Sequence, residues 1–184
     1  MRITGGTFRG RQLKTTPGMT TRPTADKIRQ AVFNILMNDI AEAQVLDLFA
    51  GSGAMGIEAI SHGAQSAVFV EAGRAQVNVI RKNLDALGLK AEVIAGDYTS
   101  ACRALEGAGR RFDLIFADPP YKEYVPLEII DTILQYNLLA PGGLLIIEHK
   151  SGQETATERL WLIKQRRFGQ TEVSFYGEKN QRPE

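Results

Sequence analysis

The chain has 184 residues, of which 43% are hydrophobic and 23% charged, and its formal net charge is +1. This length supports one domain with a full core. Its single cysteine excludes an internal disulfide framework, and one cysteine with two histidines gives no metal-ligand spacing, so we expect no metal. No apolar run reaches membrane-spanning length, and the simplest interpretation is a reduced, cytoplasmic protein, monomeric and without a membrane partner.

Positive charge is concentrated at the start of the chain. Residues 1–30 carry seven Lys or Arg against one acid, whereas residues 31–149 carry eight basic and fifteen acidic side chains. A basic arm on a mildly acidic body fits a polyanionic partner, although a solvated basic surface explains the same pattern. If the arm contacts phosphates, its affinity falls as salt rises. The candidate residues for contact with a polyanion are Arg9, Arg11, Lys14 and Arg22.

The first 40 residues are expected to form a small extension. Residues 2–14 are punctuated by glycine and predict a small hairpin. Apolar residues at helical spacing predict an amphipathic helix over residues 24–38, with Thr24 as its N-cap. We therefore divide the chain into a basic extension, residues 1–40, and a main domain, residues 41–184.

From residue 45 onward, short apolar runs alternate with segments of helical period, which is typical of βα units that build a parallel sheet. The two final runs are joined by a tight turn at Phe168-Gly169-Gln170, so the sheet is expected to end in an antiparallel hairpin. The fold class is therefore α/β, with a mostly parallel, seven-stranded sheet. The expected strands are residues 45–50, 66–71, 91–96, 112–117, 143–149, 160–169 and 170–177.

A glycine loop follows the first strand. In "DLFAGSGAMGIEA" the glycines Gly51, Gly53 and Gly56 have the spacing G-x-G-x-x-G, which lets a turn tighten and a ligand approach the backbone. Glu71 ends the second strand, twenty residues after Gly51, where an acid can accept hydrogen bonds from ribose hydroxyls. Loop, strand context and acid together predict a nucleoside-cofactor site.

The identity of that cofactor follows from two further acids, since a dinucleotide also fits the glycine pattern. Asp47 lies inside the first strand and can face a cationic amino acid portion. Asp97 follows the third strand, where it can accept a bond from an adenine amino group or act as a helix N-cap. These positions favour S-adenosylmethionine over a pyrophosphate-containing cofactor.

The fourth strand runs into "DPPY", residues 118–121. Two prolines can simply stop a strand. In open sheets of this kind, however, ligands bind at the carboxyl ends of the strands where strand order reverses, and the first and fourth strands flank that point. The glycine loop and Asp118 are therefore expected to face each other across one cleft.

Four motifs, "DLFAGSG", "VFVEAG", "GDY" and "FADPPY", resemble those of Rossmann-like class I methyltransferases that act on exocyclic amino groups. The preceding "RITGGTFRGRQL" and "TRPTADKIRQAVFNIL" resemble the start of the bacterial RsmD family, which methylates N2 of one guanine in 16S rRNA. The resemblance implies S-adenosyl-L-methionine as the cofactor and S-adenosyl-L-homocysteine as the product. The implied cofactor-binding residues are Asp47, Phe49, Gly51, Ser52, Gly53, Glu71, Asp97 and Tyr98. The implied catalytic residues are Asp118, Pro119, Pro120 and Tyr121.

This chemistry explains the tetrapeptide. An exocyclic amine conjugated with its base is a poor nucleophile, and acceptors for its protons localise its lone pair. The Asp118 carboxylate and the Pro119 carbonyl can serve as those acceptors, while Tyr121 offers a face on which a flipped base can stack.

Alternatives remain at this stage. The motifs fit guanine N2, adenine N6 and cytosine N4 equally, so guanine depends on the whole-chain resemblance. A DNA amino-methyltransferase would use the same chemistry but would need a larger target-recognition region than this chain offers. A nicotinamide-dependent oxidoreductase would use the glycine loop but leaves "DPPY" unexplained. An RNA-binding module without catalysis would keep its RNA binding when Asp118 is replaced by alanine. The resemblance implies an assembled or partly assembled small subunit as substrate, with contacts to ribosomal protein. Glu58 and His149 are expected to be structural, Glu58 as an exposed helix acid.

Overall fold

A single sheet organises the part of the chain that the computed structural model describes, residues 1–16, 23–120 and 124–178. Its strands are β1 (Gln44–Leu48), β2 (Ser66–Glu71), β3 (Glu92–Ala95), β4 (Phe112–Ala117), β5 (Leu139–Lys150), β6 (Trp161–Phe168) and β7 (Thr171–Gly177). Their order is β3-β2-β1-β4-β5-β7-β6, with β1 to β5 parallel and β7 antiparallel to both of its neighbours. The predicted mostly parallel, seven-stranded sheet with a C-terminal antiparallel hairpin is confirmed.

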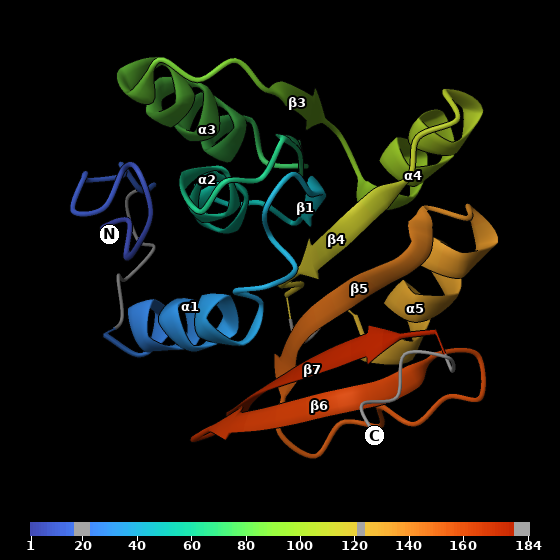
Figure 1. Cartoon of the computed structure of the whole chain (residues 1–184). Helices are drawn as coiled ribbons and strands as arrows, with labels where there is room; N and C mark the ends of the chain where they lie inside the picture. The colour runs from blue at the N-terminus through green and yellow to red at the C-terminus, as the bar shows by residue number, and fades with distance from the viewer. Residues whose placement is uncertain (17–22, 121–123, 179–184) are drawn as a thin grey trace.

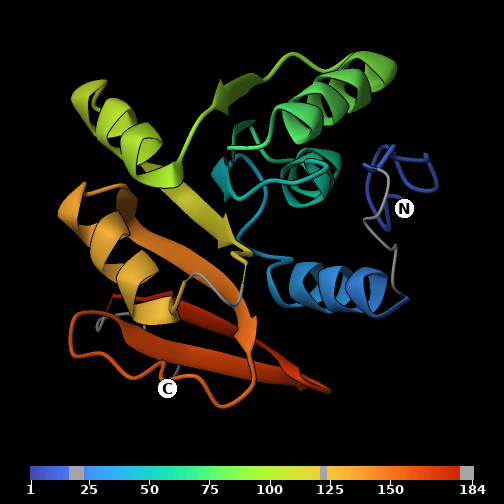
Figure 2. The ribbon, with the colours of Figure 1, turned by 180° about the vertical axis from the view of Figure 1, so that it is seen from behind.

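Helices cover both faces of this sheet. They are α1 (Pro23–Ile35), α2 (Ala54–Ser61), α3 (Arg74–Leu87), α4 (Tyr98–Gly107) and α5 (Pro126–Gln135). The first three lie on one face and the last two on the other, as Figure 1 and the reverse view in Figure 2 show. Side chains alternate accordingly along β1, where Val45 joins the core under α1 to α3 and Leu46 joins the core under α4 and α5.

The N-terminal segment packs into the first of these cores. An antiparallel bridge pairs Arg2 with Gln12, and the Ile3 N–H donates to the Arg11 carbonyl at 3.0 Å, so the predicted hairpin is confirmed. Ile3 and Leu13 are buried in the same cluster as residues of β1, β2 and β4. The extension therefore shares its hydrophobic core with the sheet.

Helix α1 departs from its predicted bounds. It begins at Pro23 and ends at Ile35, so Thr24 lies inside the helix and its assignment as N-cap is wrong. Proline suits a first helical position because the N–H that it lacks has no partner there in any helix. Among the described residues no helix is long and apolar enough to cross a membrane.

Glu58, on α2, is fully buried, which contradicts the expectation of an exposed helix acid. Its carboxylate accepts hydrogen bonds from the Thr4 N–H at 2.8 Å, the Thr4 hydroxyl at 2.7 Å and the Gly5 N–H at 2.8 Å. It also pairs with the buried Arg29 guanidinium of α1 at 2.8 Å. These donors compensate for the removal of the Glu58 carboxylate from water, and they come from segments distant in sequence. The hydrogen bonds of Glu58 therefore connect the hairpin, α1 and α2.

Replacing Glu58 by glutamine removes the charge from this network and keeps the shape of the side chain. We expect Glu58→Gln to lower the free energy of unfolding by about 3–5 kcal/mol, because Arg29 loses its buried counter-charge. Denaturant unfolding of variant and wild type measures the difference. Glu106→Gln, at an exposed position of α4, is the matched control and should shift that energy by less than about 0.5 kcal/mol. Equal stabilities for the two variants would contradict the role of Glu58.

Candidate active site

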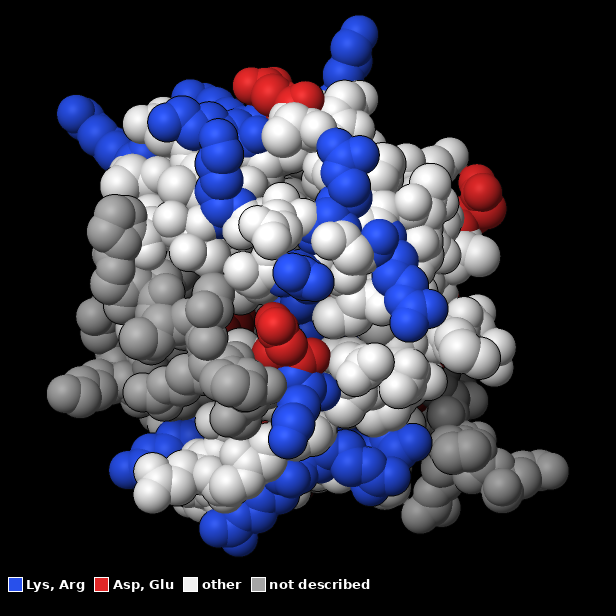
Figure 3. Space-filling view, turned by 90° about the vertical axis from the view of Figure 1, so that its left-hand side faces the viewer, with Lys and Arg blue, Asp and Glu red and all other residues white. Residues whose placement is uncertain are grey.

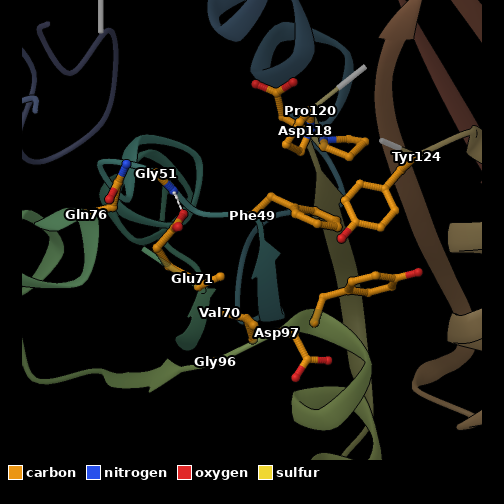
Figure 4. Close-up of a pocket in the computed structure, with 13 residues that line it drawn as sticks. Phe49, Gly51, Val70, Glu71, Gln76, Gly96, Asp97, Asp118, Pro120 and Tyr124 are labelled. Carbon is orange, nitrogen blue, oxygen red and sulfur yellow. Dashed lines mark hydrogen bonds between the residues drawn. The ribbon is translucent and has the colours of Figure 1, made fainter. Parts of the chain in front are cut away.

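Strands β1 and β4 lie side by side, and a pocket opens where they end. Leu48 pairs with Ala117, so the glycine loop after β1 and the loop after β4 start at neighbouring points of the sheet. The pocket volume is about 530 Å³. Its lining residues, drawn in Figure 4, are Phe49, Gly51, Val70, Glu71, Ala72, Gln76, Gly96, Asp97, Tyr98, Asp118, Pro119, Pro120 and Tyr124. The two loops that the sequence predicted to face one cleft do so, and we call this cleft the first pocket.

The glycine loop holds Glu71 in place. Gly51 and Gly53 have φ angles of 57° and 78°, the left-handed region that glycine adopts without strain. The Glu71 carboxylate accepts from the Gly51 N–H at 2.8 Å, as Figure 4 shows, and from the Gly73 N–H at 2.8 Å. Phe49 also has a positive φ, 59°, which is unusual for a bulky residue and marks a backbone held in place by its surroundings. The loop is thus built to fix an acid in the first pocket.

Two of the predicted cofactor residues, Ser52 and Gly53, are buried in the glycine loop and do not line the pocket. Ser52 is 4% exposed, and its carbonyl accepts from the Asn83 amide at 2.9 Å. Gly53 is buried and precedes α2 as its N-cap. A Cβ on Gly56, the third glycine of the pattern, would come within 2.4 Å of the Phe69 ring, so Gly56 permits close contact between helix and sheet.

Asp47 also lies outside the first pocket, contrary to its expected contact with the cationic part of a cofactor. It is 2% exposed, and its carboxylate accepts the Gly56 N–H at 2.9 Å. Since the N-cap residue Gly53 has no side chain, Asp47 caps the first turn of α2 from the neighbouring strand. Burial raises the pKa of Asp47 to about 7, the Gly56 N–H acts in the opposite direction, and the charge of Glu71 raises it further.

Three aromatic rings form one wall of the first pocket. The Phe49 ring lies 4.9 Å from that of Tyr98 and 5.3 Å from that of Tyr124, and the two tyrosine rings meet edge to face at 5.3 Å. Figure 4 shows the Phe49 and Tyr124 rings close to each other. Sequence reasoning missed Tyr124, which lies beyond the "DPPY" motif and has only its aromatic character as a signal. It also missed Gln76.

Asp97 caps α4 and also lines the first pocket. Its carboxylate accepts the Ser100 N–H at 2.9 Å, so the N-cap interpretation is confirmed for α4, and this bond lowers the pKa of the carboxyl. The side chain is nevertheless exposed and lines the first pocket. A carboxylate with several lone pairs can cap a helix and still accept a bond from a ligand.

The Asp118 carboxylate is directed away from Phe49 and Tyr124 (Figure 4). Asp118 as a residue is exposed, but neighbouring parts of the chain surround its carboxyl group. The resulting desolvation raises the pKa of Asp118 well above its usual range, and the charges of Glu148 and Asp47 raise it further. Pro119 is buried and Pro120 exposed, while Tyr121 lies outside the described residues.

A second cavity adjoins Asp118 on the face of the sheet that α1 covers. Its volume is about 100 Å³. Met1, α1 and the ends of β1, β4 and β5 contribute to its walls, and Asp47 and Glu148 contribute carboxylates. Asp118 therefore lines both hollows.

The basic arm lies on one side of the molecule. Arg9, Arg11 and Lys14 belong to the N-terminal hairpin, and all three are exposed. The Arg11 guanidinium donates to the Ala86 carbonyl of α3 at 3.0 Å. Figure 3 shows that Lys and Arg gather over this side, which carries the hairpin, α1 and α3, and that few acids interrupt them. The predicted contact Arg22 lies outside the described residues.

Sequence reasoning missed a second basic segment, at the end of β6. Arg166 and Arg167 are exposed there, and the β6–β7 turn points to the same side of the molecule as α1 (Figure 1). Their position in a strand expected to complete the sheet gave no signal that they would add to the basic side of the molecule. Within residues 1–16, 23–120 and 124–178, no group of three His, Cys, Asp or Glu could hold a metal ion.

Comparisons with known proteins agree over nearly the whole chain. A family model described as "Conserved hypothetical protein 95" matches residues 1–177. Ribosomal RNA small subunit methyltransferase D of Escherichia coli K12 is 34% identical over 178 residues, which cover 96% of this chain and 89% of that protein.

Solved structures share the fold. A hypothetical protein of Thermus thermophilus, TTHA0928, has a TM-score of 0.82 at 30% identity, with 95% of this chain and 98% of that chain covered. The 16S rRNA N2 G1207 methyltransferase (RsmC) of T. thermophilus, in complex with AdoMet and guanosine, has a TM-score of 0.71 at 23% identity, with 94% of this chain and 46% of that chain covered, a likeness of fold. With a Rossmann-like class I methyltransferase fold and a family match from residue 1 to residue 177, the chain belongs to the Conserved hypothetical protein 95 family, that of the RsmD methyltransferases.

Proposed function

We propose that this protein transfers a methyl group from S-adenosyl-L-methionine to the exocyclic N2 amino group of a guanine in 16S rRNA. The observation that carries the proposal is the position of the Asp118–Pro119–Pro120 segment. On one side the segment borders the first pocket, which is large enough for a nucleoside and contains Glu71, the acid expected to bind ribose hydroxyls. On the other side Asp118 borders the second cavity. A donor and an acceptor of the methyl group can thus meet at one segment of chain.

The first pocket fits S-adenosylmethionine. Its volume of about 530 Å³ is in the range of small-molecule sites, roughly 300–1,000 Å³. The Gly51 and Gly73 N–H groups orient the Glu71 carboxylate, and each of its oxygens keeps a lone pair for a ribose hydroxyl. Asp97 can accept from the adenine amino group, and the wall of Phe49, Tyr98 and Tyr124 can pack against apolar parts of the cofactor.

The reaction needs an amine lone pair and acceptors for its protons. S-adenosylmethionine supplies a methyl carbon bonded to a positively charged sulfur. The guanine N2 lone pair forms the new N–C bond, the C–S bond breaks, and its electron pair stays on sulfur. The Asp118 carboxylate and the Pro119 carbonyl hold the two N2 protons, and one proton leaves to Asp118 or water after transfer. In its ionised form Asp118 is a stronger proton acceptor than an ordinary aspartate, because its pKa is raised.

The RNA substrate follows from the family and from charge. The E. coli relative is named a ribosomal RNA small subunit methyltransferase, and the basic side shown in Figure 3 offers phosphate contacts through Arg9, Arg11 and Lys14. The proposed substrate is an assembled or partly assembled small subunit, in which ribosomal proteins are neighbours of the target. The catalytic role of Tyr121 as a stacking surface and the phosphate contact of Arg22 belong to the same proposal.

Transfer of labelled methyl from S-adenosylmethionine, followed by nucleoside analysis, tests this function. Unmethylated small subunits, naked 16S rRNA and duplex DNA are compared as substrates. We expect N2-methylguanosine from the subunits, and a loss of about 10²–10³ in kcat for Asp118→Ala, the cost typical of removing one group that stabilises developing charge. Label on adenine, on cytosine or only on DNA would refute the proposal. Full activity of Asp118→Ala would refute the role of that carboxylate.

The pH dependence of kcat/KM reports the protonation of Asp118. Only the carboxylate accepts both an amine hydrogen bond and the released proton. Since its pKa is raised, kcat/KM should fall as pH decreases through that raised value, at a higher pH than an ordinary aspartate would give. In Asp118→Asn, which does not titrate, this acidic limb should disappear. The same limb in variant and wild type would assign it to another group.

Cofactor affinity tests the first pocket separately. Glu71→Gln weakens the acceptor of the ribose hydroxyls, and hydrogen bonds to a charged group contribute about 1.5–3 kcal/mol. We expect its Kd for S-adenosylmethionine, measured by calorimetry, to rise by roughly 10- to 100-fold. Glu106→Gln, exposed on α4, is the matched control and should bind like the wild type. An unchanged Kd for Glu71→Gln would place the ribose elsewhere.

A further inference from the structure

The second cavity has the size and walls of a site for one flat ring system. Its volume of about 100 Å³ is far below the roughly 300 Å³ at which drug-sized pockets begin. Buried apolar side chains form its sides, among them Val32 of α1, Phe116 of β4 and Ile146 of β5. Such walls can hold the two faces of a base that has been turned out of its stack.

The polar groups of this cavity are mainly acceptors. Asp47, Asp118 and Glu148 contribute three carboxylates, whereas Arg29, the basic side chain of the described lining, is paired with Glu58. Asp47 is almost fully buried and caps the backbone of α2. Asp118, which is exposed, and Glu148, which is half-buried, also line the cavity and can offer carboxylate oxygens to an occupant. A carboxylate has about four lone-pair sites, so a second partner does not exhaust it.

Carboxylates placed this close repel one another. The charges of Glu148 and Asp47 both raise the pKa of Asp118, after the larger effect of desolvation. An occupant that brings N–H donors relieves this repulsion, whereas one that brings lone pairs increases it. The cavity thus selects for a ligand edge with several adjacent donors.

The three candidate bases differ in that respect. Guanine has N1–H directly beside its N2 amino group, so its edge presents neighbouring donors. In adenine the N6 amino group lies beside N1, and in cytosine the N4 amino group lies beside N3. Neither adenine N1 nor cytosine N3 carries a hydrogen, so both are hydrogen-bond acceptors. An acceptor for the atom next to the amine therefore separates guanine from the other two bases, although all three carry a methylatable amino group.

We propose that the second cavity holds the target base and that Glu148 determines specificity for guanine by accepting its N1–H while Asp118 accepts a proton of N2. This inference deepens the proposed function and rests on it. Glu148 lies on β5 and Asp118 directly follows β4, and these strands are parallel neighbours in the sheet. The spacing of the two acceptors is thereby fixed by the sheet itself.

Substitution of the target nucleotide tests Glu148. Small subunits are reconstituted with 16S rRNA that carries guanine or 2-aminopurine at the target position. The analogue keeps the 2-amino group but has a bare acceptor at N1. Since one good hydrogen-bonded pair discriminates between bases by about 1–3 kcal/mol, wild type should prefer guanine by roughly 10- to 100-fold in kcat/KM for labelled methyl transfer.

Glu148→Gln should reduce that preference about tenfold or more, because its amide can rotate to donate to the bare N1. Glu148→Asp, which keeps the charge, should retain the preference at a lower rate. Glu154→Gln, an exposed acid in the segment after β5, is the matched control. The Kd for S-adenosylmethionine should stay at the wild-type value in all variants, which verifies that they fold.

Two results would overturn the inference while leaving the proposed function intact. One is a wild type that methylates 2-aminopurine as fast as guanine. The other is a Glu148→Gln variant that prefers guanine as strongly as the wild type does. If that variant does not fold, the corresponding result is a Glu148→Asp variant that has lost the preference for guanine. If wild type forms no N2-methylguanosine on the guanine subunits, the proposed function itself fails and the inference falls with it.

Discussion

A buried carboxylate, Glu58, holds the parts of this protein together. Its oxygens accept hydrogen bonds from the backbone N–H groups of residues 4 and 5 and from the guanidinium of Arg29. The hairpin, α1 and α2 are therefore all bound to this one carboxylate. A charge in a core is costly unless donors surround it, and here the donors come from stretches of the chain far from α2 in sequence. The network therefore forms only when the extension has docked on the sheet. Because α1 also forms a wall of the second cavity, that cavity depends on the same network.

The sheet was predictable because its signals are local. Strands such as residues 66–71 and 112–117 have the expected bounds, since each is a short apolar run between polar turns. Glu58 was not predictable, because its neighbours along α2 say nothing of the donors that reach it from residues 4 and 29. The end of α1 was missed for a related reason, since apolar periodicity continues past the last helical residue, Ile35.

The functional site divides in the same way. Phe49, Gly51, Glu71, Asp97, Tyr98 and Asp118 lie around one pocket, as motif spacing and the rule for parallel sheets indicated. Asp47 has the chemistry predicted for a cofactor ligand but serves the backbone of Gly56, a preference that only the packing of α2 on β1 reveals. Tyr124 joins the pocket through two ring contacts across separate loops, which no spacing along the chain encodes.

The two hollows beside Asp118 differ in where their walls come from. The first is lined by residues from 49 to 124, all from the loops and strands of the sheet and the helices that follow them, whereas the second takes Met1 and several residues of α1 from the extension. The first pocket is thus built without the extension, whereas the second cavity cannot be completed without it. Substitutions in the extension or α1 can therefore reshape the second cavity while the loops that line the first pocket stay as they are.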